Sequence, residues 1–288
     1  MIFRTEHPIP QFPFHIGYED TLFFIGSCFS DHIGAFFSKY RFQTLANPFG
    51  TLFNPKSICD NLNRVLDQRQ ISEENIYFFN DQYISFSHQG KLSDQNKQEL
   101  IQKIGMIDSK TFNNLRESTY LFITLGTSYC YRFIENNIIV ANCHKIPNHK
   151  FEKLRLSVNE IVDDYKILID NIKKINPSIK IIFTVSPVRH LSDGFHENQV
   201  SKSILHVAID QLVDEFTVFY FPAYELFMDD LRDYRFYGLD LSHPGENGIH
   251  YMEEMIRKTF FNPETEFKFT QIEKEIKSVG HIPLNKRP

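Results

Sequence analysis

Four short apolar runs, separated by segments with helical spacing, constrain the fold of this 288-residue chain more than any other feature. They occupy residues 22–25, 120–126, 180–185 and 217–221. Each run is too short for a core helix and is apolar on both faces, as strands in the middle of a parallel sheet are. Strands that alternate with helices predict an α/β fold with a doubly wound, mainly parallel sheet. The functional site of such a fold is expected at the carboxyl ends of its strands.

The intervening segments predict helices of defined extent. Apolar residues recur at helical spacing over residues 157–175, and a proline follows. Residues 93–115 carry a helical pattern that is interrupted near Gly105 and Asp108, which predicts two short helices. A further helix is predicted over residues 201–216.

Two segments predict β-hairpins inserted between the main strands and helices. Residues 76–87 are rich in β-forming residues and have Asn80-Asp81 at their centre. Residues 129–143 alternate loosely between apolar and polar around a turn at 135–137. The hairpins are expected to decorate the α/β core.

The chain predicts one domain over residues 1–288, because no internal repeat or linker divides it and its length suits one decorated α/β domain. Residues 1–20 hold several prolines and little periodicity, so we expect an extended N-terminal arm on the domain surface. Residues 262–288 are expected to form a C-terminal appendage with one helical stretch and a disordered end at 284–288.

Charge and composition exclude several classes of function. The formal net charge is −5 and no basic face stands out, so nucleic acid is not an expected partner. No signal-peptide core or bilayer-length apolar run is recognised, and we expect a soluble, cytoplasmic protein. The four cysteines lack C-x-x-C spacing, which argues against a disulfide scaffold and a zinc ribbon. They are Cys28, Cys59, Cys130 and Cys143.

A hydroxyl and a thiol lie between the first predicted strand and the helix that follows it. Gly26 ends the strand, and Ser27 and Cys28 come next. The start of a helix offers free backbone N–H groups and the positive end of its dipole, so a nucleophile there has donors for the oxyanion it creates. Alternatively, Ser27 only caps the helix and Cys28 is a small buried apolar residue.

Asp240 and His243 precede the last core helix and supply a candidate base with its orienting carboxylate. Residues three apart in a helical turn face the same side, so Asp240 can accept from one ring nitrogen of His243 and leave the other free. The topology would bring this pair to the nucleophile from the far end of the sequence. The alternative is an Asp that caps a helix beside a surface histidine.

Arg189 and His190 end the third predicted strand, where loops reach the site of an α/β fold. Arg189 is a candidate to hold a carboxylate or phosphate of a substrate. An equally good alternative is a salt bridge between Arg189 and one of the acidic residues at 229, 230 and 233. The histidines and cysteines show no metal-motif spacing, so we expect no metal and no other cofactor.

Several blocks of the sequence resemble one known family. Residues 26–30 read Gly-Ser-Cys-Phe-Ser and match the motif that names the GSCFA family, except for Ser30 in place of Ala. The sequence is similar to that family, within the wider SGNH/GDSL hydrolase superfamily, over most of its length. The resemblance implies a flavodoxin-like three-layer α/β/α sandwich of the SGNH hydrolase type, with a nucleophile after the first strand and an Asp-x-x-His near the end. The further blocks that carry it lie at residues 47–50, 125–127, 142–145, 184–190 and 234–237.

The nucleophile block departs from the superfamily pattern. Members read Gly-Asp-Ser-Leu-Ser-Asp or similar, whereas residues 26–31 read Gly-Ser-Cys-Phe-Ser-Asp. Alignment without a gap puts Cys28 in the nucleophile's place, and a slide of one residue would put Ser27 there. A thiolate is the better nucleophile, and a helix N-terminus with an adjacent histidine is expected to lower its pKa. A cysteine thioester also passes its acyl group readily to amines or alcohols, so transfer stays open beside hydrolysis.

The oxyanion donors depart from the pattern as well. The resemblance implies the nucleophile's own N–H, the N–H of Gly50 and an Asn side chain from a third block. Asn47 belongs to the block of Gly50 and joins the substrate-binding candidates. The third block has no Asn at the expected spacing, so its candidate donors are Thr127, Ser128 or Asn142, the last of which is otherwise a turn residue.

The resemblance therefore implies an acyl-ester hydrolase or acyltransferase that forms a covalent acyl-enzyme. Its expected substrate is an acylated carbohydrate or a similar small ester. The irregular oxyanion set leaves a second hypothesis, a ligand-binding protein that keeps the fold and has lost most or all turnover. A nucleotide-binding domain is disfavoured, because no glycine-rich phosphate loop follows any predicted strand.

Overall fold

Five parallel strands form the central sheet in the computed structural model, which describes residues 5–280. They pair in the order β2-β1-β6-β10-β11, which numbers 2-1-3-4-5 along the chain and is the flavodoxin-like order. All carboxyl ends therefore lie at one edge, and the strand order reverses between β1 and β6, where ligands bind in such sheets. The strands are β1 (Thr21–Gly26), β2 (Gln43–Ala46), β6 (Tyr120–Leu125), β10 (Lys180–Val185) and β11 (Phe219–Tyr220).

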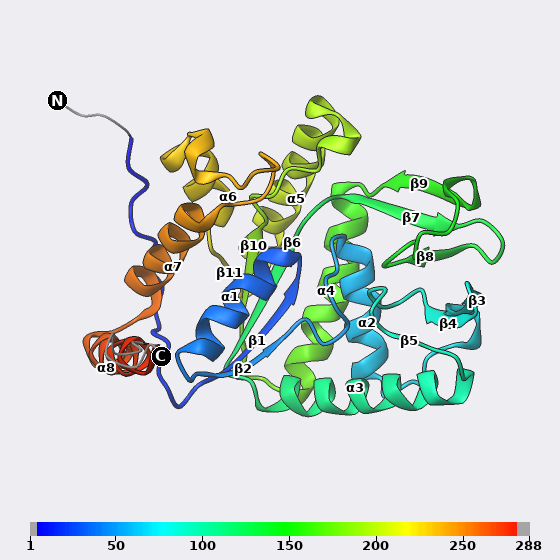
Figure 1. Cartoon of the computed structure of the whole chain (residues 1–288), viewed down its shortest axis with the longest axis horizontal. Helices are drawn as coiled ribbons and strands as arrows, with labels where there is room; N and C mark the ends of the chain where they lie inside the picture. Colours follow the sequence, from blue (N-terminus) through cyan, green and yellow to red (C-terminus); the bar gives the residue numbers. More distant parts are fainter. Residues whose placement is uncertain (1–4, 281–288) are drawn as a thin grey trace, which may run out of the picture.

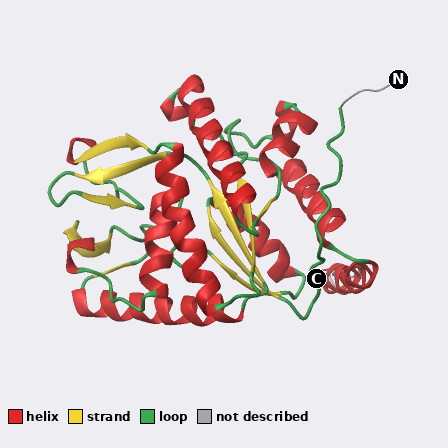
Figure 2. Ribbon diagram, turned by 180° about the vertical axis from the view of Figure 1, so that it is seen from behind, coloured by secondary structure: helices red, strands yellow, loops and turns green. Residues whose placement is uncertain are grey.

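Helices cover both faces of the sheet and complete a three-layer α/β/α sandwich, as the sequence predicts (Figures 1 and 2). The first layer holds α1 (Cys28–Lys39), α7 (Glu246–Phe260) and α8 (Pro263–Gly280). The second holds α2 (Pro55–Leu66), α4 (Val158–Ile175) and α5 (Phe195–Glu215), with α3 (Lys97–Glu117) along its end.

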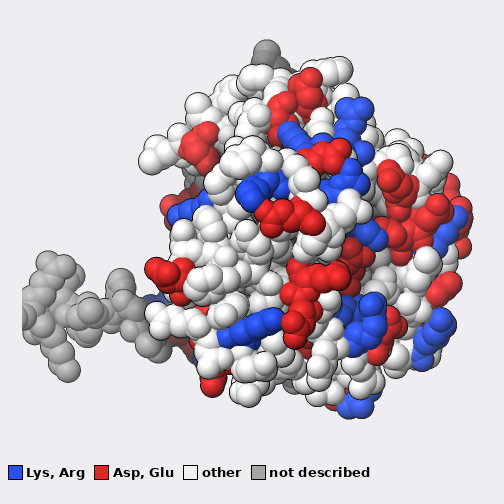
Figure 3. All heavy atoms as spheres, turned by 90° about the vertical axis from the view of Figure 1, so that its right-hand side faces the viewer, with Lys and Arg blue, Asp and Glu red and all other residues white. Residues whose placement is uncertain are grey.

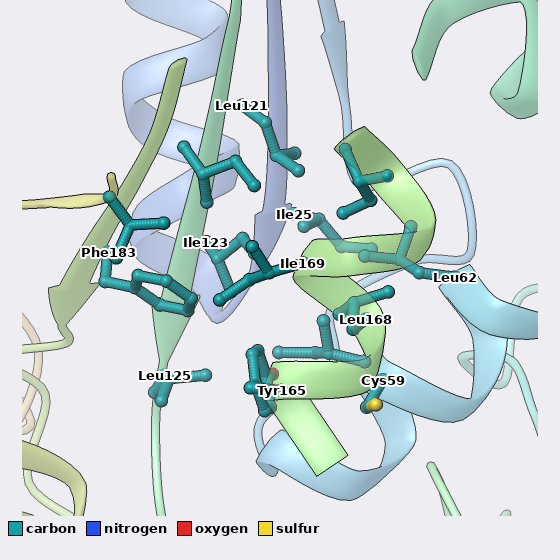
Figure 4. Packing of buried hydrophobic residues seen from close by; sticks show 14 of the residues in the cluster. Ile25, Cys59, Leu62, Leu121, Ile123, Leu125, Tyr165, Leu168, Ile169 and Phe183 are labelled. Carbon is teal, nitrogen blue, oxygen red and sulfur yellow. The ribbon is translucent and has the colours of Figure 1, made fainter. Parts of the chain in front are cut away.

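Alternation along the strands explains why the runs are apolar throughout. Phe23 and Ile25 of β1 pack on the face covered by α2, α4 and α5, around residues such as Tyr165 and Leu168 (Figure 4). Leu22 and Phe24 point to the opposite face, toward α1 and α7. Helices shield both faces of the sheet from water, so every position of the strand requires an apolar side chain.

The two predicted hairpin segments form two small antiparallel sheets at one end of the molecule (Figures 1 and 2). The turn between β3 and β4 holds Asn80 and Asp81, both with positive φ, which is the conformation of a primed hairpin turn. Both hairpin predictions are confirmed. The first sheet contains β3 (Ile76–Phe79), β4 (Gln82–Ser85) and β5 (Ser93–Asp94), and the second contains β7 (Tyr129–Phe133), β8 (Ile138–Val140) and β9 (Phe151–Arg155).

Two predicted helices differ from the structure, and one strand is absent from the prediction. Residues 97–117 form one helix rather than two, because burial of Leu100, Ile104 and Leu115 outweighs the cost of about 1 kcal/mol for a mid-helix glycine. Helix α5 begins at Phe195 rather than 201, since polar residues are buried in its first turns. Strand β2 is absent from the prediction because it is a short edge strand with Gln and Thr among its four residues.

Short turns of helix connect the larger elements. Residues 223–236 form α6 (Ala223–Glu225), a π-helical turn (Leu226–Leu231) and a 3₁₀ turn (Tyr234–Phe236). Further 3₁₀ turns lie at Glu73–Asn75, Asn148–Lys150 and Leu191–Asp193.

Both ends of the described chain pack on the layer that holds α1 and α7. Residues 5–20 contain no helix or strand, but Phe14 and Ile16 are buried there, and the N–H of Ile16 donates to the carbonyl of Phe260 (2.8 Å). Helix α8 adds Phe269 to the same cluster. The predicted disorder at 284–288 lies outside the described residues.

Charged side chains of both signs are interspersed on the face shown in Figure 3, without a large basic patch. Within residues 5–280, no helix combines the length and the apolarity that a bilayer span requires.

Candidate active site

The turn after β1 presents Cys28 and buries Ser27. Gly26 has a φ of +131° and lies so close to β6 that a Cβ there would meet the Thr124 carbonyl oxygen at 2.1 Å, so only glycine fits. The Ser27 side chain is buried and caps α1, with Oγ accepting from the N–H of Phe29 (3.3 Å). Cys28 is the first residue of α1 and is partly exposed, and its N–H is among those at a helix start that have no acceptor within the helix.

Asp240 fixes the ring of His243. Its Oδ2 lies 2.5 Å from Nδ1 of His243, and its Oδ1 accepts from the N–H groups of Ser242 and His243, each at 3.0 Å. Those backbone hydrogen bonds and the bond to the ring lower the pKa of Asp240 to about 2. A carboxylate only accepts, so the proton of the neutral ring sits on Nδ1 and Nε2 is left as the basic nitrogen.

Cys28 and His243 line the same narrow pocket, although they stand near opposite ends of the sequence. The pocket has a volume of about 10 Å³, room for one water molecule, so a bound acyl group requires its lining to open. The rest of the wall is mostly apolar. The wall is formed by Phe29, His32, Ile33, Val188, Pro244, Ile249 and Met252.

The pKa of the Cys28 thiol is raised, contrary to the expectation from the sequence. Burial raises it most and the carboxylate of Asp31 raises it further, while the N–H groups of residues 28 and 29 and the charge of Lys202 oppose them. The helix N-terminus acts in the predicted direction, but desolvation outweighs it. The resting residue is a thiol, and it needs a base to become a nucleophile.

Lys202 is a buried residue of this region that the sequence analysis missed. It lies on α5 with no exposed surface, and its Nζ donates to the carbonyl oxygens of Gly126 (2.5 Å) and Ser186 (2.7 Å). Burial lowers its pKa to about 7. The sequence signal was its place in the buried stripe of α5, where it precedes Leu205 by three positions.

The block at residues 47–50 supports the nucleophile turn through its own hydrogen bonds. The N–H of Gly50 donates to the carbonyl of Asn47 (2.8 Å). The Asn47 side chain accepts from the N–H of Gly26 (2.8 Å) and donates to the carbonyl of Ser27 (3.4 Å). In this structure the N–H of Gly50 is used within the turn, and the role of Gly50 and Asn47 toward a substrate stays a prediction.

The candidate donors of the third block are also engaged. The Oγ of Ser201 is shared by Thr127 Oγ1 (3.0 Å) and by the N–H (2.8 Å) and Oγ (3.1 Å) of Ser128. Asn142 does not line the pocket, and its Oδ1 accepts from the N–H of His144 (2.7 Å) as a turn residue does. The N–H of Cys28, at the start of α1, remains a candidate donor.

Arg189 and His190 lie beside the loop that carries His243. The N–H of Arg189 donates to the carbonyl of Ser242 (3.4 Å), and its buried Nε has no hydrogen-bond partner among residues 5–280. Of the acidic residues named as alternative partners, Asp229 pairs with Arg232 and Asp233 with Arg235. Burial, with the nearby charge of Lys202, lowers the pKa of His190 to about 4, so this ring stays neutral.

In the part of the chain that the structure describes, no three His, Cys, Asp or Glu side chains are grouped in a way that would hold a metal ion.

The profile of the GSCFA family matches residues 21–255. No curated protein matches the sequence significantly.

The solved structures that are similar to this chain include three at low identity. One, assigned as a platelet activating factor from Streptococcus pneumoniae, has a TM-score of 0.43 and 11% identity, with 83% of each chain covered. A variant of Axe2, an acetyl-xylooligosaccharide esterase from Geobacillus stearothermophilus, has a TM-score of 0.42 and 13% identity over 86% of this chain and 98% of its own. A family 3 carbohydrate esterase from Clostridium thermocellum has a TM-score of 0.35 and 12% identity over 83% and 94%.

Proposed function

This chain belongs to the GSCFA family, and we propose that it is an ester hydrolase or acyltransferase that works through an acyl-enzyme on Cys28. The observation that carries the proposal is the shared pocket of Cys28 and His243, with Asp240 behind the ring. A nucleophile, a base and an orienting carboxylate in one place are the parts that acyl transfer requires. The 2-1-3-4-5 sheet order, with the nucleophile after β1, supports a place in the SGNH/GDSL superfamily.

In the proposed reaction, Nε2 of His243 removes the thiol proton as Sγ of Cys28 attacks the ester carbonyl. The tetrahedral oxyanion accepts from the N–H of Cys28 at the start of α1. Its collapse forms a thioester and expels the alcohol, which takes the proton back from His243. Water or an acceptor hydroxyl then attacks the thioester with the same base, and the free thiol is restored.

The choice of Cys28 over Ser27 rests on exposure. Ser27 is 1% exposed and its Oγ already accepts a hydrogen bond as the helix cap, whereas Cys28 lines the pocket. The narrow, largely apolar pocket favours a short acyl group such as acetyl. An acylated carbohydrate or similar small ester is the substrate class that we propose.

The test is hydrolysis of p-nitrophenyl acetate by the wild type, Cys28→Ala and Ser27→Ala. Cys28→Ala is expected to lose about 10⁴-fold in kcat or more, and Ser27→Ala to keep most activity. Cys143→Ala is the matched control, because it removes another partly exposed thiol that lies outside the pocket. Loss with Ser27→Ala alone would move the nucleophile by one residue.

A ligand-binding protein without turnover is the second candidate. The internal hydrogen bonds of Gly50 and Thr127 favour it, because they occupy the donors that an oxyanion hole would use. Wild-type protein that hydrolyses the ester no faster than Cys28→Ala would support this candidate and contradict the enzyme.

A further inference from the structure

We propose that Lys202 is a positioning residue whose buried ammonium stabilises the thiolate of Cys28 from beneath the nucleophile turn. The inference extends the proposed function, since it assigns a role to a charge that the triad does not use. It rests on where α5 places Lys202, against the carboxyl ends of two strands of the sheet.

Lys202 is anchored at the carboxyl ends of two strands next to β1. Its ammonium holds the carbonyl of Gly126, directly after β6, and that of Ser186, directly after β10. Gly26 pairs with Thr124 in the parallel β1–β6 ladder, so Cys28 and Gly126 both lie two residues beyond that pair. Cys28 opens α1 directly after β1, and β6 lies about 4.8 Å from β1 in the sheet. The ammonium and the thiol interact electrostatically across this edge, each affecting the ionisation of the other.

Two carbonyls and the ring of Tyr224, whose centroid lies 6.0 Å from Nζ, compensate only part of the cost of burying this ammonium. An ammonium has three N–H donors, and an incompletely compensated charge is costly to bury. A thiolate at Cys28 offsets that cost, and the effect is reciprocal: ionised Cys28 raises the pKa of Lys202, and charged Lys202 lowers that of Cys28.

Other charged and titratable groups around Cys28 and Lys202 also affect the ionisation of these two side chains. Asp31 of α1 opposes the thiolate. Arg189, after β10, favours the neutral form of Lys202. His190 stays neutral at physiological pH, and His243 lines the pocket from the opposite loop. Among these groups, Lys202 is the buried cation coupled directly to the thiol.

A purely structural role would be to satisfy carbonyls at strand ends, and Lys173 provides the matched control. Its Nζ donates to the carbonyls of Ile179 (2.6 Å) and Pro177 (3.5 Å) at the amino edge of the sheet, just before β10 begins. Lys173→Met therefore removes a comparable lysine–carbonyl anchor far from Cys28.

The experiment measures alkylation of Cys28 by iodoacetamide, site by site with peptide mass spectrometry, in wild type, Lys202→Met and Lys173→Met. No ester is used, so the result is independent of whether the protein turns over a substrate. At pH 6, where Lys202 is charged, the wild type is expected to react about tenfold faster than Lys202→Met, as a one-unit change in the thiol pKa requires. By pH 9 Lys202 is neutral, its pKa being about 7, and the two rates should converge.

Equal rates of wild type and Lys202→Met at both pH values, or a ratio that does not change with pH, would overturn the proposal. Lys173→Met should follow the wild type throughout. If Lys202→Met does not fold, the pH profile of His243→Ala carries the test, because its logarithmic rate should flatten near pH 7 as Lys202 loses its proton. A straight rise through that range would contradict the role.

Discussion

Two regions of this molecule present histidines, and their surroundings differ in every respect that matters for proton transfer. His243 has 53% of its side chain exposed and is held by the carboxylate of Asp240. His88 has no exposed surface, and its Nδ1 meets only the hydroxyl of Ser85 (2.8 Å). Burial, with the charge of Arg64 close by, lowers the pKa of His88 to about 3.

His88 and its neighbour His144 hold the hairpin insertions against the core. His144 Nε2 contacts the carbonyl of Ser85 (2.9 Å), and the ring of His88 packs edge-on against Phe49. Burial lowers the pKa of His144 as well. The contrast teaches that a ring with a carboxylate partner and solvent access is equipped to exchange protons, whereas a dry ring without one serves packing.

The largest expected effect separates the two histidines by activity. His243→Ala should lower kcat on p-nitrophenyl acetate by about 10⁴-fold, because the thiol then has no base, and should leave the melting temperature nearly unchanged. His144→Ala is the matched control and should retain activity in whatever fraction of the protein folds. Turnover that persists in His243→Ala would contradict the role of His243 as the base.

A second effect appears in stability at acid pH. The unfolded chain binds a proton at His88 below pH 6.5 and the folded protein does not until about pH 3, so the free energy of unfolding falls as the pH drops through this window. The loss from this group is on the order of 4 kcal/mol. Urea titrations at pH 7 and pH 4 should show a shallower pH dependence for His88→Asn, and an unchanged slope would mean that the ring takes up its proton in the folded state.

Removal of the carboxylate partner should have an intermediate effect. Asp240→Asn keeps the size of the side chain but no longer favours the Nδ1 proton, and we expect kcat to fall by about 10²-fold. The pair is half-exposed, so the loss should be smaller than for a buried triad. Asp233→Asn, which breaks a surface pair with Arg235 in the same stretch, is the control. Equal activity of the two variants would contradict an orienting role.

The smallest predicted effect concerns Ser27. Ser27→Ala removes the N-cap of α1 and should cost about 1 kcal/mol of unfolding free energy. Ser157→Ala, at the N-cap of α4, should cost a similar amount and is the control. Chemical denaturation measures both. A loss of activity in Ser27→Ala beyond what its stability explains would give the hydroxyl a chemical role.

Sequence patterns predicted the parts of this molecule that short-range rules determine. Strands buried on both faces are apolar at every position, so β1, β6 and β10 stand out, whereas the edge strand β2 does not. The spacing of Asp240 and His243 predicted their contact because it spans one turn of chain.

Hydrogen bonds between residues far apart in the sequence could not be predicted from these short-range rules. The hydroxyl of Thr127 looks free in the sequence but shares a hydrogen bond with Ser201, 74 positions further along the chain. The raised pKa of Cys28 depends on how deeply the turn is buried, and the burial of Lys202 depends on which face of α5 meets the sheet.

The most direct test of the central claim is to identify the acylated residue. The protein is mixed with p-nitrophenyl acetate, quenched in acid during turnover and digested for mass spectrometry. We predict one acetyl group on the peptide that contains Cys28, located on its sulfur and removed by neutral hydroxylamine. Turnover with the acetyl group on Ser27, or with no acyl group on Cys28, would contradict the account.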